Sequence, residues 1–132
     1  MVLDASAVVA LLADSGELGD WVAQAVSGAS VAAPELVLFE TANILRRHQL
    51  AGRLDRSATT LAHEDLLSLP LQLWPYRHLA ERVWELRDNL TVFDASYVSL
   101  AEFLGARLVT LDIKLAKAPE IRCPIQTPML PT

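Results

Sequence analysis

The sequence predicts an α/β fold: a three-layer α/β/α sandwich around a central, mostly parallel sheet. Short apolar runs rich in β-branched residues alternate with longer segments of helical periodicity, which is the pattern of strands joined by crossover helices. The length of 132 residues fits one hydrophobic core, so we expect a single domain over residues 1–132.

The first half of the chain is expected to form two strands and four helices. The strands are the short apolar runs at residues 1–4 and 29–33. Apolar residues at helical spacing predict helices at residues 7–13, 18–26, 35–50 and 56–69. We expect Pro34 in the first turn of the third of these helices, where no partner for a backbone N–H is needed.

The second half is expected to alternate in the same way. Residues 71–74 and 108–111 predict strands, and a weaker strand is expected near Ile125. Helices are expected at residues 79–87 and 95–104, with a short one at 114–118. Gly105 is expected to end the second of these helices. From about residue 119 the chain is rich in proline, which predicts an edge strand and then an extended tail.

The composition excludes several classes of protein. With 52% hydrophobic and 20% charged residues, the chain is too apolar to be disordered, and we expect part of the excess at an interface. The single cysteine, Cys123, excludes an intrachain disulfide and a thiolate zinc site. No apolar run approaches the roughly 18 residues of a membrane span, and no signal peptide is recognisable. A cytoplasmic protein without membrane association is expected.

Two aspartates follow expected strands. Asp4 ends the first strand, and Asp112 ends the strand at residues 108–111. Functional groups gather at the carboxyl ends of strands in open parallel sheets, so both aspartates are candidates for a site. Aspartate is also a preferred helix N-cap, and capping is the simpler explanation for either residue alone.

Two further acids lie on or beside expected helices. Asp94 directly precedes a helix, so an N-cap is again the alternative. Glu40 is the only charge in residues 36–45 and cannot be a cap. With Asn43 and Arg47 it forms a narrow polar stripe, which predicts that the stripe faces a cleft while the rest of the helix is buried. An ion pair between Glu40 and an arginine at the surface is the alternative.

Together the four acids predict a metal site. Carboxylates ~5 Å apart repel by roughly 3 kcal/mol per pair at an effective dielectric constant of about 20, so a cluster needs a cation or protons. Oxygen ligands without clustered His or Cys favour Mg²⁺ or Mn²⁺ over Zn²⁺. Such an ion would orient a phosphodiester and lower the pKa of an attacking water.

The four acids stand in four short segments, residues 2–6, 34–43, 93–101 and 108–112. These segments resemble the four acidic motifs of PIN-domain ribonucleases. In order, spacing and total length the chain most resembles VapC-type toxins of bacterial type II toxin–antitoxin pairs. Phe93 stands where many relatives carry Tyr, a change beside Asp94 that leaves the acid in place.

The resemblance implies a PIN-like fold and Mg²⁺-dependent endoribonuclease activity. It implies that the catalytic and metal-binding residues are Asp4, Glu40, Asp94 and Asp112. It also implies RNA as the substrate, a homodimer, and a cognate VapB-type antitoxin that blocks the site in a heterotetramer or a larger complex.

The antitoxin is expected to act through a flexible segment. A cluster of acids would accept an inserted arginine or lysine from that segment. The first two helices, around Leu11, Leu12, Leu18 and Trp21, are the candidate docking surface. Ordinary core packing explains each of these four side chains equally well.

Polar residues near the acids are candidates for supporting roles. Ser6, Asn43 and Thr110 are expected to support the carboxylates, because a hydroxyl or amide can bond a carboxylate or a phosphate. Candidate contacts to RNA phosphates are Arg46, Arg47 and Lys114. His48, His63 and His78 lack ligand spacing and are expected to face solvent or to cap helices.

The acidic balance of the chain does not exclude RNA. The net charge is −5, and without the four candidate ligands it is −5 + 4 = −1. A metal ion and local cations can therefore bind RNA in the cleft, without long-range attraction.

Two other functions remain open. One is a protein-binding module that keeps the fold without catalysis, although no motif acid is missing. The other is a Mg²⁺-dependent phosphoryl-transfer enzyme or acceptor built on Asp residues, Thr110 and Lys114. An acceptor normally pairs adjacent acids after its first strand, whereas Ala5 and Ser6 follow Asp4 here.

Overall fold

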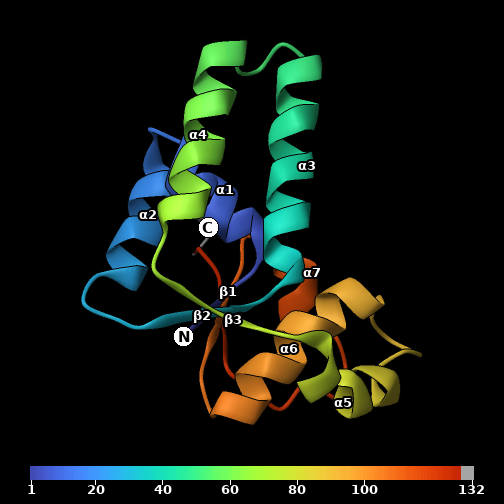
Figure 1. Cartoon of the computed structure of the whole chain (residues 1–132). Coiled ribbons are helices and arrows are strands. Elements are labelled where there is room, and N and C mark those ends of the chain that lie inside the picture. The colour runs from blue at the N-terminus through green and yellow to red at the C-terminus, as the bar shows by residue number, and fades with distance from the viewer. Residues whose placement is uncertain (129–132) are drawn as a thin grey trace.

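A computed structural model describes residues 1–128, and its centre is one sheet of five parallel strands (Figure 1). The strands are β1 (Val2–Leu3), β2 (Val31–Pro34), β3 (Leu71–Trp74), β4 (Leu108–Val109) and β5 (Ile125–Gln126). They lie in the order β3-β2-β1-β4-β5, and each neighbouring pair is parallel. The predicted mostly parallel sheet is confirmed.

Helices cover both faces of the sheet. They are α1 (Ala5–Ala13), α2 (Glu17–Val26), α3 (Leu36–Leu50), α4 (Arg56–Ser68), α5 (Ala80–Glu85), α6 (Val92–Leu104) and the short α7 (Ile113–Ala116). In Figure 1, α1 to α4 lie on one side of the strands and α5 and α6 on the other. The predicted three-layer sandwich is confirmed. None of the helices in residues 1–128 is long and apolar enough to cross a membrane.

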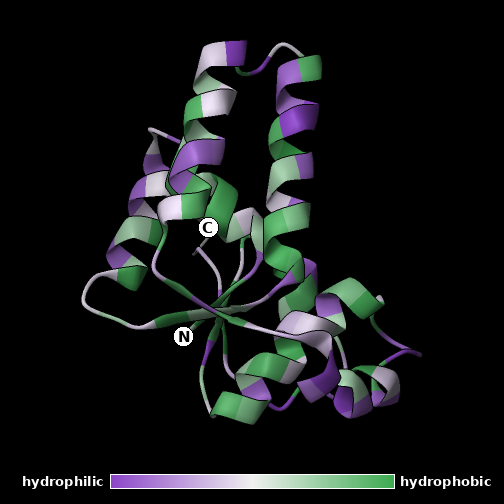
Figure 2. Cartoon of the chain, in the orientation of Figure 1, coloured by the Kyte–Doolittle hydropathy of each residue, from purple (hydrophilic) through white to green (hydrophobic). Residues whose placement is uncertain are grey.

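The core lies where the central strands meet the helices. Val2, Leu3, Leu108 and Val109 in β1 and β4 have no exposed surface, and the hydrophobic colouring of Figure 2 is concentrated there. Burial of apolar side chains on both faces explains why these strands read as continuous apolar runs rather than as alternating ones. Asp4 directly follows one of these two buried strands, and Asp112 follows the other after two residues, so the strand expected at residues 108–111 ends earlier than predicted.

The structure corrects the expected place of Pro34. Pro34 is the last residue of β2, where it pairs with Trp74 of β3, and α3 begins only at Leu36. The backbone N–H of Glu35 still donates to the carbonyl of Trp74 at 2.9 Å. Because the strand contacts continue through residue 35, the helix starts after them.

Two expected helices have different bounds. α6 begins at Val92 instead of residue 95, because the Thr91 hydroxyl accepts from the backbone N–H of Asp94 and caps the helix one turn earlier. The helix expected at residues 79–87 is a 3₁₀ turn at Tyr76–His78 followed by α5, which ends at Glu85.

The C-terminal half otherwise follows the sequence pattern. Gly105 has the left-handed backbone (φ 61°) of a residue that ends a helix, as expected. β5 is the edge strand expected near Ile125. The end of the expected tail, residues 129–132, lies outside the described residues.

Gly19 allows α2 to approach the end of α1. A Cβ atom at Gly19 would lie 1.9 Å from the carbonyl oxygen of Asp14 and 2.9 Å from that of Ala10. Backbone cannot move aside as a side chain can. We therefore expect Gly19→Ala to lower the free energy of unfolding by about 2–3 kcal/mol, at the upper end of overpacking substitutions. Chemical denaturation measures this loss, and Gln24→Ala on the exposed side of α2 is the control expected to stay near wild type.

Candidate active site

The candidate site lies at the carboxyl end of the sheet. Asp4 directly follows β1, and Asp112 follows β4 after two residues. These strands are neighbours, and the chain winds away from them in opposite directions, to β2 and β3 on one side and to β5 on the other. Such a switch in strand order leaves a crevice at the strand ends, where open α/β sheets bind ligands.

Asp4 is held by three donors. Its Oδ1 accepts from the Ser6 hydroxyl at 2.6 Å and from the backbone N–H of Ala7 at 3.0 Å. Its Oδ2 accepts from the Thr110 hydroxyl. Asp4 thus caps α1, as the alternative interpretation expected, and is only 7% exposed. Capping does not exclude a role in the site, because the carboxylate of Asp4 also lies within the field of Asp112.

Thr110 connects the ends of β1 and β4. Its hydroxyl donates to Asp4 and accepts from the backbone N–H of Asp112 at 3.0 Å. The Ser6 hydroxyl makes a parallel link, since it accepts from the backbone N–H of Leu111 at 3.1 Å. The expected hydrogen bonds from Ser6 and Thr110 to a carboxylate are confirmed. The carboxylate of Asp112 also caps α7, where it accepts from the backbone N–H of Lys114.

Glu40 reaches the site from α3. Its Oε1 accepts from the hydroxyl of Tyr97 in α6 at 2.7 Å. An ion pair between Glu40 and an arginine is absent from the described residues, although the charge of Arg47 lowers the pKa of Glu40. The larger effect is burial, which raises the pKa of Glu40. Burial and the bond to Glu40 also raise the pKa of Tyr97, so the tyrosine hydroxyl stays neutral and donates.

Asp94 reaches the site from the first turn of α6. Its side chain is not the N-cap that the sequence suggested as an alternative, because Thr91 has that role. The side chain is half-buried, and this burial raises the pKa of Asp94. An acid in the first turn is also favoured by the helix dipole. The Thr91 hydroxyl, close to the carboxylate, has the opposite and smaller effect on this pKa. The carboxylate does not cap the helix and is available to the site.

The four carboxylates are electrostatically coupled. Burial is the largest cause of the raised pKa values of Asp4, Glu40 and Asp94, and neighbouring charges add to it. Asp112 acts on Asp4, Asp94 and Asp4 act on Glu40, and Asp112 and Asp4 act on Asp94. Among residues 1–128, the ion pairs involve only Arg82 with Glu85 and Glu102, away from these acids. Charge interactions therefore link the four acids, and none of the four has an ion pair within the described residues.

The side chains of the four acids do not form a complete metal coordination site in this structure. No group of three or more His, Cys, Asp or Glu side chains in the described part of the chain is arranged to hold a metal ion. Local hydrogen bonds hold these carboxylates in other orientations. The Asp112 carboxylate caps α7, and that of Glu40 accepts from Tyr97. Both oxygens of Asp4 accept hydrogen bonds.

The polar stripe of α3 differs from the expectation. Asn43, Arg46 and Arg47 are exposed, and so is Phe39, at 79%. The prediction that the rest of this helix is buried was wrong. α3 packs on α1 and α4, and the hairpin of α3 and α4 extends beyond the sheet in Figure 1, so the face of α3 that is turned away from these two helices stays exposed.

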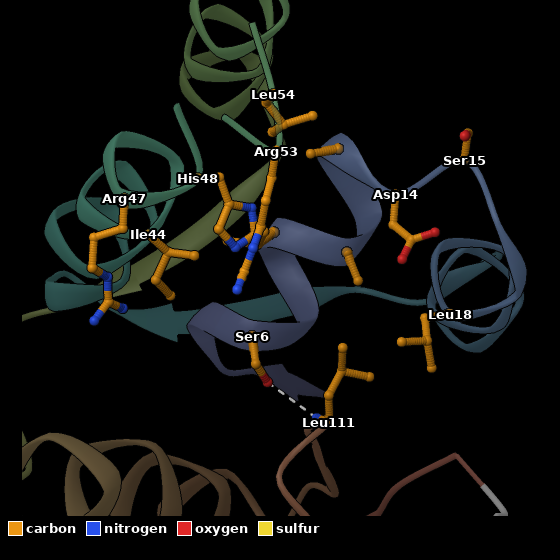
Figure 3. A pocket seen from close by; sticks show the side chains of 13 residues that line it. Ser6, Asp14, Ser15, Leu18, Ile44, Arg47, His48, Arg53, Leu54 and Leu111 are labelled. Carbon is orange, nitrogen blue, oxygen red and sulfur yellow. Dashed lines mark hydrogen bonds between the residues drawn. The ribbon is translucent and has the colours of Figure 1, made fainter. Parts of the chain in front are cut away.

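A pocket of about 590 Å³ includes Ser6, the residue that bonds Asp4, although none of the four candidate acids lines it (Figure 3). Ser6 and Leu111 lie at its base, Arg47, His48 and Arg53 form one wall, and Leu18 lies opposite. His48 therefore lines a pocket rather than only facing solvent. Arg47 contributes to the pocket as well as to the field around Glu40. Lys114 is exposed on α7, next to the cap made by Asp112.

The comparison with known protein families agrees with this geometry. The family model of the PIN domain matches residues 1–121. The chain belongs to the PIN domain family. Curated relatives include ribonuclease VapC9 of Mycobacterium tuberculosis, 38% identical over 125 residues that cover 95% of both chains. Ribonuclease VapC12 of the same species is 35% identical and covers 89% of this chain and 91% of its own.

Two solved structures share the fold of this chain. PAE2754 from Pyrobaculum aerophilum superposes with a TM-score of 0.71 at 27% identity, over 94% of this chain and 81% of that one. VapC20 of Mycobacterium tuberculosis, described as a toxin that cleaves the sarcin-ricin loop, has a TM-score of 0.67 at 18% identity, over 88% and 92%. These likenesses support the α/β/α architecture predicted from the sequence.

Sequence reasoning missed three contributors to the site region. Tyr97, Thr91 and Arg53 were not singled out as candidate site residues. A signal existed for Tyr97, since a buried tyrosine hydroxyl needs a partner and Glu40 is the isolated charge of the preceding motif. Arg53 comes from the turn after α3, whose path over the pocket is a tertiary feature.

Proposed function

We propose that this protein is a metal-dependent endoribonuclease toxin that a cognate antitoxin neutralises. The observation that carries the proposal is the set of four coupled carboxylates at the strand-order switch of a PIN-family sheet, with no neutralising ion pair in the described residues. The names of its relatives, VapC ribonucleases, support the same activity. The most direct experiment is an RNA-cleavage assay with and without Mg²⁺.

The chemistry of the four acids suits a hard divalent cation, and their side chains would have to move closer together to bind one. The donors are carboxylate oxygens, and the pKa values of Asp4 and Asp94 are raised by burial and also by the charges of neighbouring acids. A cation between the acids would relieve this repulsion. Asp4, Glu40, Asp94 and Asp112 would hold Mg²⁺ or Mn²⁺. When bound, the ion supplies charge to polarise a phosphodiester and to lower the pKa of a water.

The chain's own residues prepare this chemistry. Ser6 and Thr110 fix the orientation of the Asp4 carboxylate by donating hydrogen bonds to it. The Thr110 hydroxyl also accepts from the backbone N–H of Asp112 and so fixes the backbone at that residue. Asp94 keeps a carboxylate free of a capping bond. Arg46, Arg47 and Lys114 would contact RNA phosphates around the acids, because they are exposed and lack salt bridges within residues 1–128.

Metal ions are expected to stabilise the fold. Because an ion that binds only the native state adds to stability, Mg²⁺ or Mn²⁺ should raise the melting temperature in proportion to the logarithm of its concentration above Kd. Glu40→Gln should reduce the shift, and Glu64→Gln on α4 is a matched control that should keep it. Differential scanning calorimetry with millimolar Mn²⁺ and with EDTA measures the effect; identical melting curves would contradict it.

The pH dependence of this stability has a defined sign. The raised pKa values of Asp4, Glu40 and Asp94 mean that the folded chain binds protons more tightly than the unfolded chain does. In EDTA, their contribution to stability is full below the ordinary carboxyl range and is lost as pH rises through the raised values. Protons compete with the ion for the same oxygens, so the Mn²⁺-dependent shift should grow as pH rises.

An antitoxin segment has a place to dock beside the acids. Solved complexes among the structural neighbours include a toxin–antitoxin complex from Klebsiella pneumoniae, with a TM-score of 0.64 at 19% identity, over 97% of both chains. In this chain, the pocket of Figure 3 offers apolar side chains of α1 and α2 next to Ser6. A bound segment would place apolar side chains there and extend a basic side chain to the carboxylates.

The structure narrows the docking surface expected from the sequence. Leu11, Leu12 and Trp21 are partly buried and pack against the main core, as the core-packing alternative predicted. Leu18 is 43% exposed and lines the pocket. We therefore assign docking to the pocket around Leu18.

A homodimer also belongs to this proposal, assembled with the antitoxin into a heterotetramer or a larger complex. Phe39 and Phe93 are 79% and 58% exposed, and each directly precedes a candidate acid. Large exposed aromatic side chains favour contact with a partner. Light scattering on the purified chain measures the oligomeric state.

A further inference from the structure

We propose that Tyr97 is a positioning residue that aims Glu40 at the metal site; this inference rests on the proposed function. Tyr97 is not an acid of the four motifs, and its ring lies in the core at 2% exposure. Its hydroxyl is the polar end of that buried side chain, and it donates to Glu40 Oε1 at 2.7 Å.

The bond joins the two helical layers. Glu40 stands on α3, on one side of the sheet, and Tyr97 stands on α6, on the other side (Figure 1). Tyr97 follows Asp94 by three residues, which is one turn of α6, so both side chains lie on the same face of that helix. α6 thus supplies Asp94 to the site, and it also supplies the Tyr97 hydroxyl that holds Glu40 of α3.

Glu40 needs such a donor. Its neighbours Phe39 and Asn43 are exposed, so close packing does not restrict the side chain on that surface of α3. Within the described residues, Tyr97 is the one hydrogen-bond partner of the Glu40 carboxylate. With Oε1 held by the hydroxyl, Oε2 is left for a cation. A glutamate without this bond would lose rotamer freedom when it binds the ion, which weakens binding.

The ring of Tyr97 and its hydroxyl have separable roles. The ring fills the core between α6 and the sheet, as a phenylalanine would, while the hydroxyl serves Glu40. Tyr97→Phe therefore removes the positioning bond and keeps the packing. Partners that orient metal ligands typically contribute about 10- to 100-fold to metal affinity.

The test is Mn²⁺ binding to the full chain by isothermal titration calorimetry. Tyr97→Phe is expected to weaken Mn²⁺ binding about 10- to 100-fold and to lower kcat for RNA with little change in KM. Tyr76→Phe is the matched control, because Tyr76 is the other tyrosine, is 49% exposed and makes no side-chain hydrogen bond in residues 1–128. Its Mn²⁺ affinity should equal that of the unaltered chain.

A double-mutant cycle shows whether Tyr97 acts through Glu40. In the Glu40→Gln background, Tyr97→Phe should cost little further affinity, because the carboxylate it positions is gone. Equal losses in both backgrounds would overturn the inference, and so would wild-type Mn²⁺ affinity in Tyr97→Phe. A Tyr97→Phe chain that no longer folds would overturn it too, since the hydroxyl would then be structural.

The outcomes also separate this inference from the proposed function. If the unaltered chain binds no Mn²⁺ and cleaves no RNA, the proposed function fails. If it does both and Tyr97→Phe changes neither, the inference about Tyr97 fails alone.

Discussion

Asp94→Asn and Asp112→Asn are each expected to lower RNA cleavage by more than about 100-fold while the chain stays folded. Replacing a residue that only orients a metal ligand typically lowers metal affinity or activity by about 10- to 100-fold, and the loss of a ligand itself should be larger. The reason for choosing asparagine is that it caps helices about as well as aspartate. Asp112 caps α7, so asparagine preserves that bond and removes only the charge. Asp94 makes no capping bond, so its replacement has little structural cost. Cleavage of RNA in Mg²⁺, with circular dichroism to verify folding, measures both effects.

The matched control is Asp55→Asn. Asp55 caps α4 by accepting from the backbone N–H of Ala58 at 2.7 Å, and α4 belongs to the hairpin that extends away from the strand ends (Figure 1). This variant should cleave RNA as the unaltered chain does. Full activity in Asp94→Asn and Asp112→Asn together would show that these aspartates are structural and that the four-acid site is wrong.

The second large effect concerns growth of cells that express the protein. Expression of the chain alone is expected to arrest growth, and co-expression of a cognate antitoxin, sought in the neighbouring open reading frame, is expected to restore it. Changing the basic residues of the antitoxin's flexible segment to alanine should abolish this relief, because no cation would then enter the acid cluster. Binding should remain, since the apolar contacts around Leu18 are intact. Colony counts and co-purification measure the two properties separately.

Leu18→Asp provides the complementary change on the toxin. A charge on the apolar side of the pocket should weaken antitoxin binding and leave toxicity unchanged, because Leu18 lies on α2, outside the four acids. Absence of toxicity from the unaltered chain would contradict the toxin assignment. Toxicity that no neighbouring protein relieves would contradict the antitoxin part.

Sequence periodicity was sufficient for the layers of the fold. Strands buried on both faces read as apolar runs, and the helices between them are long enough to return the chain for parallel pairing. The predicted bounds of helices and strands were less accurate where a single side chain or a single backbone hydrogen bond determines the end of the element. Thr91 starts α6 a turn early, and the N–H of Glu35 prolongs the contacts of β2 beyond Pro34.

The acids were predictable because each breaks a local pattern. Glu40 is a lone charge in an apolar segment, and Asp4 and Asp112 each follow an apolar run of the sequence. What these residues touch was less predictable, because it depends on elements far apart in the sequence. The bond between Tyr97 and Glu40 spans 57 residues, and that between Thr110 and Asp4 spans 106. The exposed face of α3 follows from the hairpin with α4, which the periodicity of α3 alone does not encode.

The proposed function requires the four carboxylates to bind a divalent cation that promotes cleavage of RNA. The most direct measurement is cleavage of a structured RNA by the purified chain in EDTA, then after excess Mg²⁺ or Mn²⁺ is added back, with Asp4→Asn assayed in parallel. We expect no cleavage in EDTA, recovery with either metal ion, and no recovery in Asp4→Asn. Undiminished cleavage in EDTA, or equal cleavage by Asp4→Asn, would contradict the claim.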